Sequence, residues 1–242
     1  MRFRRHPKLN PIRGKRDGKV ISPGPPSVIP LFATPFCVVS FSGSEALNGV
    51  LAPLFADHAA RERSRQAGHQ ASRYSSRDDL FEWPNEPVQE LKNGIVEAVM
   101  AFVRSINDFS DEQLNSFRIQ ARSWYTIVGT DGCVPSVSYP NAAWCAIYCI
   151  AAPPPSPTRF DSGVLRLHES FRTTMFSDAT TARTHMPYQP GHNTWRPEPG
   201  QVALFPASIT HEIAMMRGEG ELILVTALFR FVAPGQTGIP WW

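Results

Sequence analysis

Hydrophobic and polar positions follow two different periods along this chain, and the period changes near residue 117. Before that point, apolar residues of the segment 86–106 recur every three or four positions, which predicts an amphipathic helix lying on an apolar surface. Pro87 suits the first turn of this helix, where its missing N–H costs nothing. A second helix is predicted over 44–66, with Ser44 as its cap and a kink at Pro53.

After residue 117 the period is two, and short segments rich in β-branched and aromatic residues alternate with turn sequences. These segments span 117–128, 142–150, 163–170, 200–206, 210–216 and 221–232. A first strand is predicted earlier, within 31–41. Helices followed by many short strands predict a mainly β fold with flanking helices, namely a sandwich or jelly roll with the helices packed outside one sheet.

The composition predicts one folded domain with a charged arm. The chain has 242 residues, of which 42% are hydrophobic, and this is enough for a single sizeable core. We expect a basic, proline-rich and disordered arm over 1–29, a folded domain over 30–233 and a tail over 234–242. The net charge of +3 is concentrated in the arm. Such an arm could bind nucleic acid or an anionic membrane surface, and a solvated tail without a partner is the simpler expectation.

Other features of the sequence limit where the protein acts. Its longest apolar run, 142–152, is well short of the roughly 18 to 20 residues that a membrane helix needs, and no secretory signal follows the basic arm. The four cysteines include no CxxC pair, which favours a reducing compartment. A soluble, cytoplasmic protein is therefore predicted. Cys145 and Cys149 share one face of a predicted strand and are expected to be buried hydrophobes.

Several enzyme classes are excluded because their motifs are missing: the P-loop, the dinucleotide-binding glycine turn, the GxSxG elbow and the HExxH helix. A jelly roll can instead hold a metal at its mouth, with two histidines and a carboxylate. On a strand, the first two of these ligands would stand two residues apart. None of the seven histidines is followed two positions later by Asp or Glu, so the residues alone do not predict such a site.

The order of the sequence blocks nevertheless resembles a known family over roughly 30–232. The chain is similar to the 2-oxoglutarate/Fe(II) oxygenases of bacteria and their viruses. The resemblance is carried by PLFATPF, LNGVLAPLF, GHQASRYSSRDDLFEWP, ARSWYTIVGTDG, YPNAAWCAIYCIAAP, SGVLRLHES, PEPGQVALFPASITHEI and ELILVTALFRF. It implies a double-stranded β-helix, Fe(II) and 2-oxoglutarate as cofactors, and the hydroxylation or desaturation of a small molecule or peptide in the barrel mouth.

The family's functional positions map onto this chain only in part. By the resemblance, His211 would be the distal iron-binding histidine. Val137 and Tyr139 stand where the family shows two histidines, and Leu224 stands where an arginine grips the carboxylate of 2-oxoglutarate. Thr226 keeps the hydroxyl of a neighbouring serine. Replacing arginine by leucine removes a bidentate partner for the carboxylate of 2-oxoglutarate. With Val137 and Tyr139 in place of the two histidines, His211 alone would hold Fe(II) poorly. Both cofactors are therefore expected to bind weakly.

Other residues are candidates to rebuild the site. Strand alternation points either His168 or Glu169 inward, and His168 could join His211 around a metal. Arg230 shares a face with Thr226 and could bind the cosubstrate, and Arg217 in a nearby loop is a second candidate. Tyr139 is also a candidate ligand.

Three functions remain open at this stage. The first is an active oxygenase, and the second is a catalytically inactive pseudo-oxygenase that serves as a binding or scaffold module. The third is metal-free catalysis with His211 as general acid or base. The sequence assigns no catalytic residue beyond these possibilities.

Overall fold

The computed structural model describes residues 33–65, 72–168 and 192–237. The chain divides into two compact units, Met1–Leu31 and Phe32–Trp242, and all described residues belong to the second. The predicted basic arm over 1–29 therefore lies outside the described residues, as do the final residues of the predicted tail. The strands and helices are described within the second unit alone.

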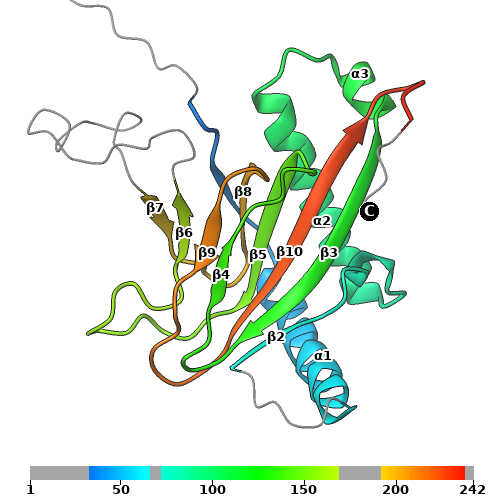
Figure 1. Cartoon of the computed structure of the whole chain (residues 1–242). Coiled ribbons are helices and arrows are strands. Elements are labelled where there is room, and N and C mark those ends of the chain that lie inside the picture. The colour runs from blue at the N-terminus through cyan, green and yellow to red at the C-terminus, as the bar shows by residue number, and fades with distance from the viewer. Residues whose placement is uncertain (1–32, 66–71, 169–191, 238–242) are drawn as a thin grey trace, which may run out of the picture. The chain divides into compact units, whose positions relative to one another are not determined.

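Two antiparallel sheets form the framework (Figure 1). The larger sheet has the order β1 (Cys37–Ser40), β8 (Gln201–Pro206), β5 (Trp144–Ala151), β10 (Leu222–Val232), β3 (Arg118–Val128) and β2 (Arg73–Ser75). The smaller sheet has the order β4 (Val134–Val137), β9 (His211–Ile213), β6 (Leu165–His168) and β7 (His192–Trp195). Neighbouring strands in both sheets are distant in sequence, so each sheet forms only when the whole domain folds.

Helices cover one face of the larger sheet. These are α1 (Ser44–Arg65) and α2 (Glu86–Ser105), with a short 3₁₀ turn at Leu80–Glu82, and α3 (Asp111–Ser116) follows α2. The apolar positions predicted for α2 are buried as far as Phe102, and Pro87 lies in its first turn. The predicted mainly β fold, with N-terminal helices outside one sheet, is confirmed.

Strand alternation divides the interior into two apolar clusters. On β10, odd-numbered residues from Ile223 to Phe229 face the helices, where they join the core that contains α1 and α2. Even-numbered residues such as Leu224 and Leu228 face the smaller sheet. This second cluster fills the space between the sheets, and it is here that the fold brings strand side chains together from both sides.

Besides β2 and the 3₁₀ turn at Leu80–Glu82, three elements were not predicted from the sequence. The strands β4 and β7 are short, and their sequences VPSV and HNTW lack a clear apolar alternation. Each is defined by pairing with a distant strand, β4 with β9 and β7 with β6. The six-residue α3 is set by a local capping box in which Ser110 and Gln113 bond reciprocally. Neither strand pairing nor a capping box gives a hydrophobic period in the sequence, so the hydrophobic pattern did not predict these elements.

Candidate functional site

The histidine singled out by the sequence, His211, begins β9 and points into the space between the two sheets. Its side chain is buried, with 3% of the residue exposed. The ring Nδ1 lies 2.8 Å from the backbone oxygen of Ile209. A carbonyl oxygen only accepts, so Nδ1 carries the proton and Nε2 is left with a lone pair. Burial holds the pKa of this imidazole below its usual value, and His211 is therefore neutral near pH 7.

The residues beside His211 in the sheet are apolar. Val137 of β4 pairs with His211 on one side, and Leu167 of β6 pairs with it on the other. Directly paired residues of antiparallel strands project to the same face. Val137 thus stands at the point where the resemblance places a ligating histidine, and its side chain offers no donor atom to a metal.

Aromatic rings enclose the imidazole. The ring centroid of Phe205 is 5.0 Å from that of His211, and Tyr139 is at 5.7 Å. Trp124 packs against Tyr139 in turn, at 5.5 Å. Burial, helped by the neighbouring Cys145, raises the pKa of Tyr139 to about 12. Its phenol is therefore protonated at neutral pH and is suited to donate a hydrogen bond.

His168 lies on the other face of the smaller sheet. Because Leu167 shares a face with His211, alternation along β6 turns His168 away from it. His168 Nε2 is instead 3.7 Å from Glu212 Oε2, on the side where Ser136 also bonds Glu212. The structure does not bring the two predicted metal-binding imidazoles together. The apolar Leu165 and Leu167 at alternate positions were the signal that could have shown this.

The predicted cosubstrate residues are both buried and both face the interior. Thr226 lies on the face of β10 that carries Leu224 and is 8% exposed. It pairs with Trp124 of β3, the residue that packs on Tyr139. Arg230 is also 8% exposed, and its Nε donates to the backbone oxygen of Asn141. Arg230 is thus held next to the Tyr139 segment, close to the His211 end of the interior.

The other candidates for rebuilding the site lie elsewhere or outside the described residues. Arg217 is in the loop that follows β9, and its Nη1 is 2.6 Å from Asp131 Oδ1. β9 runs from His211 toward this loop, so Arg217 belongs to the opposite end of the sandwich. Glu169 lies outside the described residues. At the position of the family's arginine, Leu224 is 2% exposed and packs in the core between the sheets.

The interior therefore holds a neutral imidazole, a protonated phenol, a hydroxyl and a guanidinium, set among aromatic rings. Within 33–65, 72–168 and 192–237, no group of three or more His, Cys, Asp or Glu side chains is placed to hold a metal ion. Sequence reasoning missed Trp124 and Phe205 as walls of this region. The alternation of inward-facing and outward-facing positions along β3 and β8 was the signal that could have placed both residues on the inner face.

Comparison with known proteins shows which family this part of the chain is similar to. Residues 122–226 match a family model described as "Putative 2OG-Fe(II) oxygenase". The resemblance predicted from the sequence is confirmed by this match. No curated protein has a sequence that matches the chain. The family implies Fe(II) and 2-oxoglutarate as cofactors and oxidation as the activity.

Solved structures of these oxygenases share the fold. A prolyl-4-hydroxylase of Pseudomonas putida aligns with 81% of this chain and 92% of its own, at 11% identity and a TM-score of 0.54. HygX of Streptomyces hygroscopicus, solved with nickel and 2-oxoglutarate, aligns over 86% of both chains, at 13% identity and a TM-score of 0.51. An oxidoreductase of the 2OG-Fe(II) oxygenase family from Burkholderia pseudomallei aligns over 59% of this chain and 57% of its own, at 13% identity and a TM-score of 0.40. The predicted double-stranded β-helix is confirmed.

The residues present do not fit the implied cofactors. Fe(II) in such sites needs two imidazoles and a carboxylate in fixed geometry, with further groups orienting them. Among the described residues, the interior supplies one imidazole, and its cross-strand neighbours are Val137 and Leu167. By the resemblance, Leu224 stands where a guanidinium would bind the carboxylate of 2-oxoglutarate. In the described parts of the chain, no helix is long and apolar enough to cross a membrane.

Proposed function

We propose that this chain, whose residues 122–226 match the 2-oxoglutarate/Fe(II) oxygenase family, is a pseudo-oxygenase that binds a small molecule or peptide in the barrel mouth without oxidising it. The observation that carries the proposal is the setting of His211. Its neighbours in the sheet are Val137 and Leu167, and the position that should bind 2-oxoglutarate is a buried leucine. Oxidation by this family's chemistry needs all of these positions, whereas binding does not.

The groups that remain suit recognition by hydrogen bonding. Neutral His211 offers a lone pair at Nε2, and the phenol of Tyr139 is a donor, since its pKa is raised to about 12. Trp124 and Phe205 supply flat apolar walls around them. A ligand with an aromatic or aliphatic body, a hydrogen-bond donor and an acceptor would match this set. Each such contact contributes about 0.5 to 1.5 kcal/mol, and more where the partner is charged.

The proposal is tested by restoring the missing ligands. In the double variant Val137→His, Tyr139→His the two histidines return to a face shared with His211. Both positions are partly exposed, so the substitutions are compatible with folding. Anaerobic titration with Mn(II), followed by electron paramagnetic resonance, should show weak or no binding to the native protein and a gain of at least about tenfold in the variant.

Two controls make this result interpretable. Adding His211→Ala to the double variant should remove the gained affinity, and circular dichroism should show that all variants keep the β fold. Consumption of 2-oxoglutarate by the native protein, abolished in His211→Ala, would overturn the proposal.

A second candidate function is an active oxygenase, and one observation favours it. The bond from His211 Nδ1 to the Ile209 carbonyl fixes the tautomer that leaves Nε2 open, as in metal-binding histidines. Under this candidate His211 would hold Fe(II), and Thr226 and Arg230 would lie on the cosubstrate side. One equivalent of Fe(II) bound by the native protein, together with turnover of 2-oxoglutarate, would distinguish this candidate from the first.

A further inference from the structure

A proline-rich loop joins β5 to β6 at the end of the sandwich opposite His211. Its sequence is APPPSPTRF, residues 152–160. Proline has no N–H for a sheet ladder, which explains why β5 ends at Ala151. Each proline also fixes its own φ and keeps the preceding residue extended. These constraints favour the polyproline II region over 153–156, and the chain bends at Pro157 and Thr158.

The loop displays a regularly spaced set of exposed side chains. Pro154, Pro157 and Arg159 are all exposed, and Phe160 is 80% exposed. Polyproline II has three residues per turn, so Pro154 and Pro157 fall on the same edge. Arg159 follows two residues later, beyond a bend at Pro157 and Thr158, and adds an exposed positive charge near that edge. The spacing is thus a PxxP segment flanked by a cation.

Hydrogen bonds fix the end of this loop to the body of the domain. The Ser162 hydroxyl donates to the Arg217 backbone oxygen at 3.1 Å and accepts from the Arg217 N–H at 2.8 Å. Arg196 donates to the backbone oxygens of Ser162 and Phe160. The backbone N–H of Ser162 donates to the Arg159 oxygen at 3.1 Å. An anchored, preshaped segment loses less conformational entropy on binding than a free peptide does.

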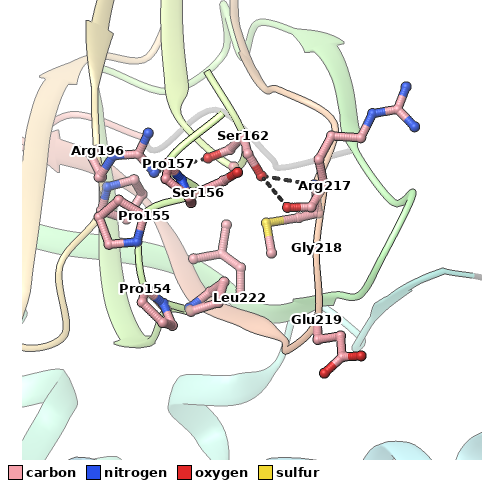
Figure 2. Close-up of a pocket in the computed structure, with 15 residues that line it drawn as sticks. Pro154, Pro155, Ser156, Pro157, Ser162, Arg196, Arg217, Gly218, Glu219 and Leu222 are labelled. Atoms are coloured by element: carbon pink, nitrogen blue, oxygen red, sulfur yellow. Dashed lines mark hydrogen bonds between the residues drawn. The ribbon is translucent and has the colours of Figure 1, made fainter. Parts of the chain in front are cut away.

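A cavity of about 260 Å³ lies between the prolines and the loop that follows β9 (Figure 2). Pro154, Pro155 and Pro157 form one wall, and Gly218 and Glu219 lie across from them. The guanidinium groups of Arg196 and Arg217 at its rim are bound to the chain itself. The cavity is thus not built for an anion, and it lies on the side of the proline run that faces the body of the domain.

We infer that residues 154–159 are a docking segment for an SH3-type domain, whose aromatic-lined groove binds the edge carrying Pro154 and Pro157 and whose acidic residues pair with Arg159. Grooves of this kind recognise PxxP segments in the polyproline II form. The surface is independent of the interior, because β5 starts beside Pro206 at the His211 end and reaches the prolines only at its other end. A bound partner would therefore leave the barrel mouth open.

The test is a binding assay of the full chain against an array of purified SH3 domains, with an array of WW domains beside it. We expect at least one SH3 domain to bind. The double variant Pro154→Ala, Pro157→Ala should weaken that binding by at least about tenfold, and Arg159→Glu should weaken it by a similar factor. Thr158→Ala is the matched control and should leave the affinity within about twofold. This exposed residue lies outside the three-residue spacing of Pro154 and Pro157, and its hydroxyl contacts the Ser156 hydroxyl of the same loop at 3.4 Å.

Three results would overturn the inference. The first is that no SH3 domain binds the native chain more tightly than it binds the double variant. The second is binding that survives both proline substitutions, and the third is binding by WW domains alone. Thermal melting of each variant shows whether the fold is intact, and exposed substitutions of this kind should leave it unchanged. The metal titration of the Val137 and Tyr139 variant addresses a different end of the domain, so failure of either proposal leaves the other standing.

Discussion

The two faces of the larger sheet are filled by different kinds of residue. The face under α1 and α2 is packed with hydrophobic side chains such as Phe55, Leu91 and Phe229, each fully buried. The face toward the smaller sheet is also apolar for most of its length. At one end, however, it carries the buried polar residues Thr226 and Arg230, and β9 of the smaller sheet adds the buried His211 to the same interior. One face thus serves stability, and the other also holds the polar groups on which the proposed function depends.

Under the proposed pseudo-oxygenase function, this difference shows how a fold could persist after its catalytic site is lost. Buried polar groups persist when they are hydrogen-bonded, and His211 and Arg230 are each bound to a backbone oxygen of this chain. They no longer need a metal or a cosubstrate to be stable in the interior. Meanwhile Val137 pairs with His211 across the sheet, and Leu224 is buried in the core between the sheets.

The largest effect should come from the helix-covered face. Phe229→Ala removes a fully buried ring from the cluster beneath the helices, and we expect the free energy of unfolding to fall by about 3 to 5 kcal/mol. Thr226→Ala, three residues earlier on the opposite face, should cost only about 1 kcal/mol. Urea denaturation of both variants measures the contrast, and equal losses would show that the two faces do not differ as described.

A polar contact within the same helix-covered face gives the next effect. The hydroxyl of Tyr148 donates to Asn48 Oδ1 at 2.9 Å, and both residues are buried. Tyr148→Phe leaves the Asn48 carbonyl without its donor and should cost about 1 to 3 kcal/mol in urea denaturation. Replacing both partners, as Tyr148→Phe with Asn48→Leu, should recover part of the loss. No cost in the single variant would mean that this bond does not link α1 to the sheet.

Much of this fold follows from the sequence, and the parts that do not are the non-local ones. The alternation in β10 correctly predicts that Thr226 and Arg230 share a face with Leu224. Every second residue of a strand points to the same face, so this prediction needs no information about the neighbouring strands. The strands β4 and β7 could not be predicted in this way, since only pairing with β9 and β6 defines them. Helix α2, with a regular apolar period, was predicted to within a residue of its ends.

The titration of His211 should produce a smaller, pH-dependent effect. Burial holds its pKa below the unfolded value of 6.5, so the unfolded chain binds a proton that the folded chain does not. Stability should therefore fall as the pH drops below 6.5, with a limiting slope of about 1.4 kcal/mol per pH unit. In His211→Gln this part of the slope should be lost. Denaturation at pH 7.5 and 5.5 measures it, and equal slopes in both proteins would contradict the buried, neutral assignment.

The smallest effect concerns the cysteines, which are all free thiols. Cys145 and Cys149 are buried, as predicted from their shared strand face, and burial raises the pKa of Cys149 to about 12. A thiol reagent at pH 8 should therefore leave both unmodified in the native protein and label them only after unfolding. Mass spectrometry of native and denatured samples reports this directly. Rapid native labelling of Cys145 would show that the space between the sheets is open to solvent.

The candidate site was predictable only in part. The hairpin that carries His211 resembles its family closely enough to place that residue, and the structure puts Val137 and Tyr139 beside it. The orientation of His168 depends on which face of β6 packs against the larger sheet, and the alternating Leu165 and Leu167 were the sequence signal for that face. The anchoring of Arg230 by Asn141 likewise joins residues that are far apart in the chain.

The most direct test of the central claim is metal binding by the unmodified protein. Mn(II) titrated under anaerobic conditions, with 2-oxoglutarate present and followed by electron paramagnetic resonance, reports the affinity of the interior for a divalent cation. A pseudo-oxygenase with one interior imidazole should bind no tighter than about 1 mM. One equivalent bound at micromolar concentration and lost in His211→Ala would contradict that claim and establish an intact metal centre.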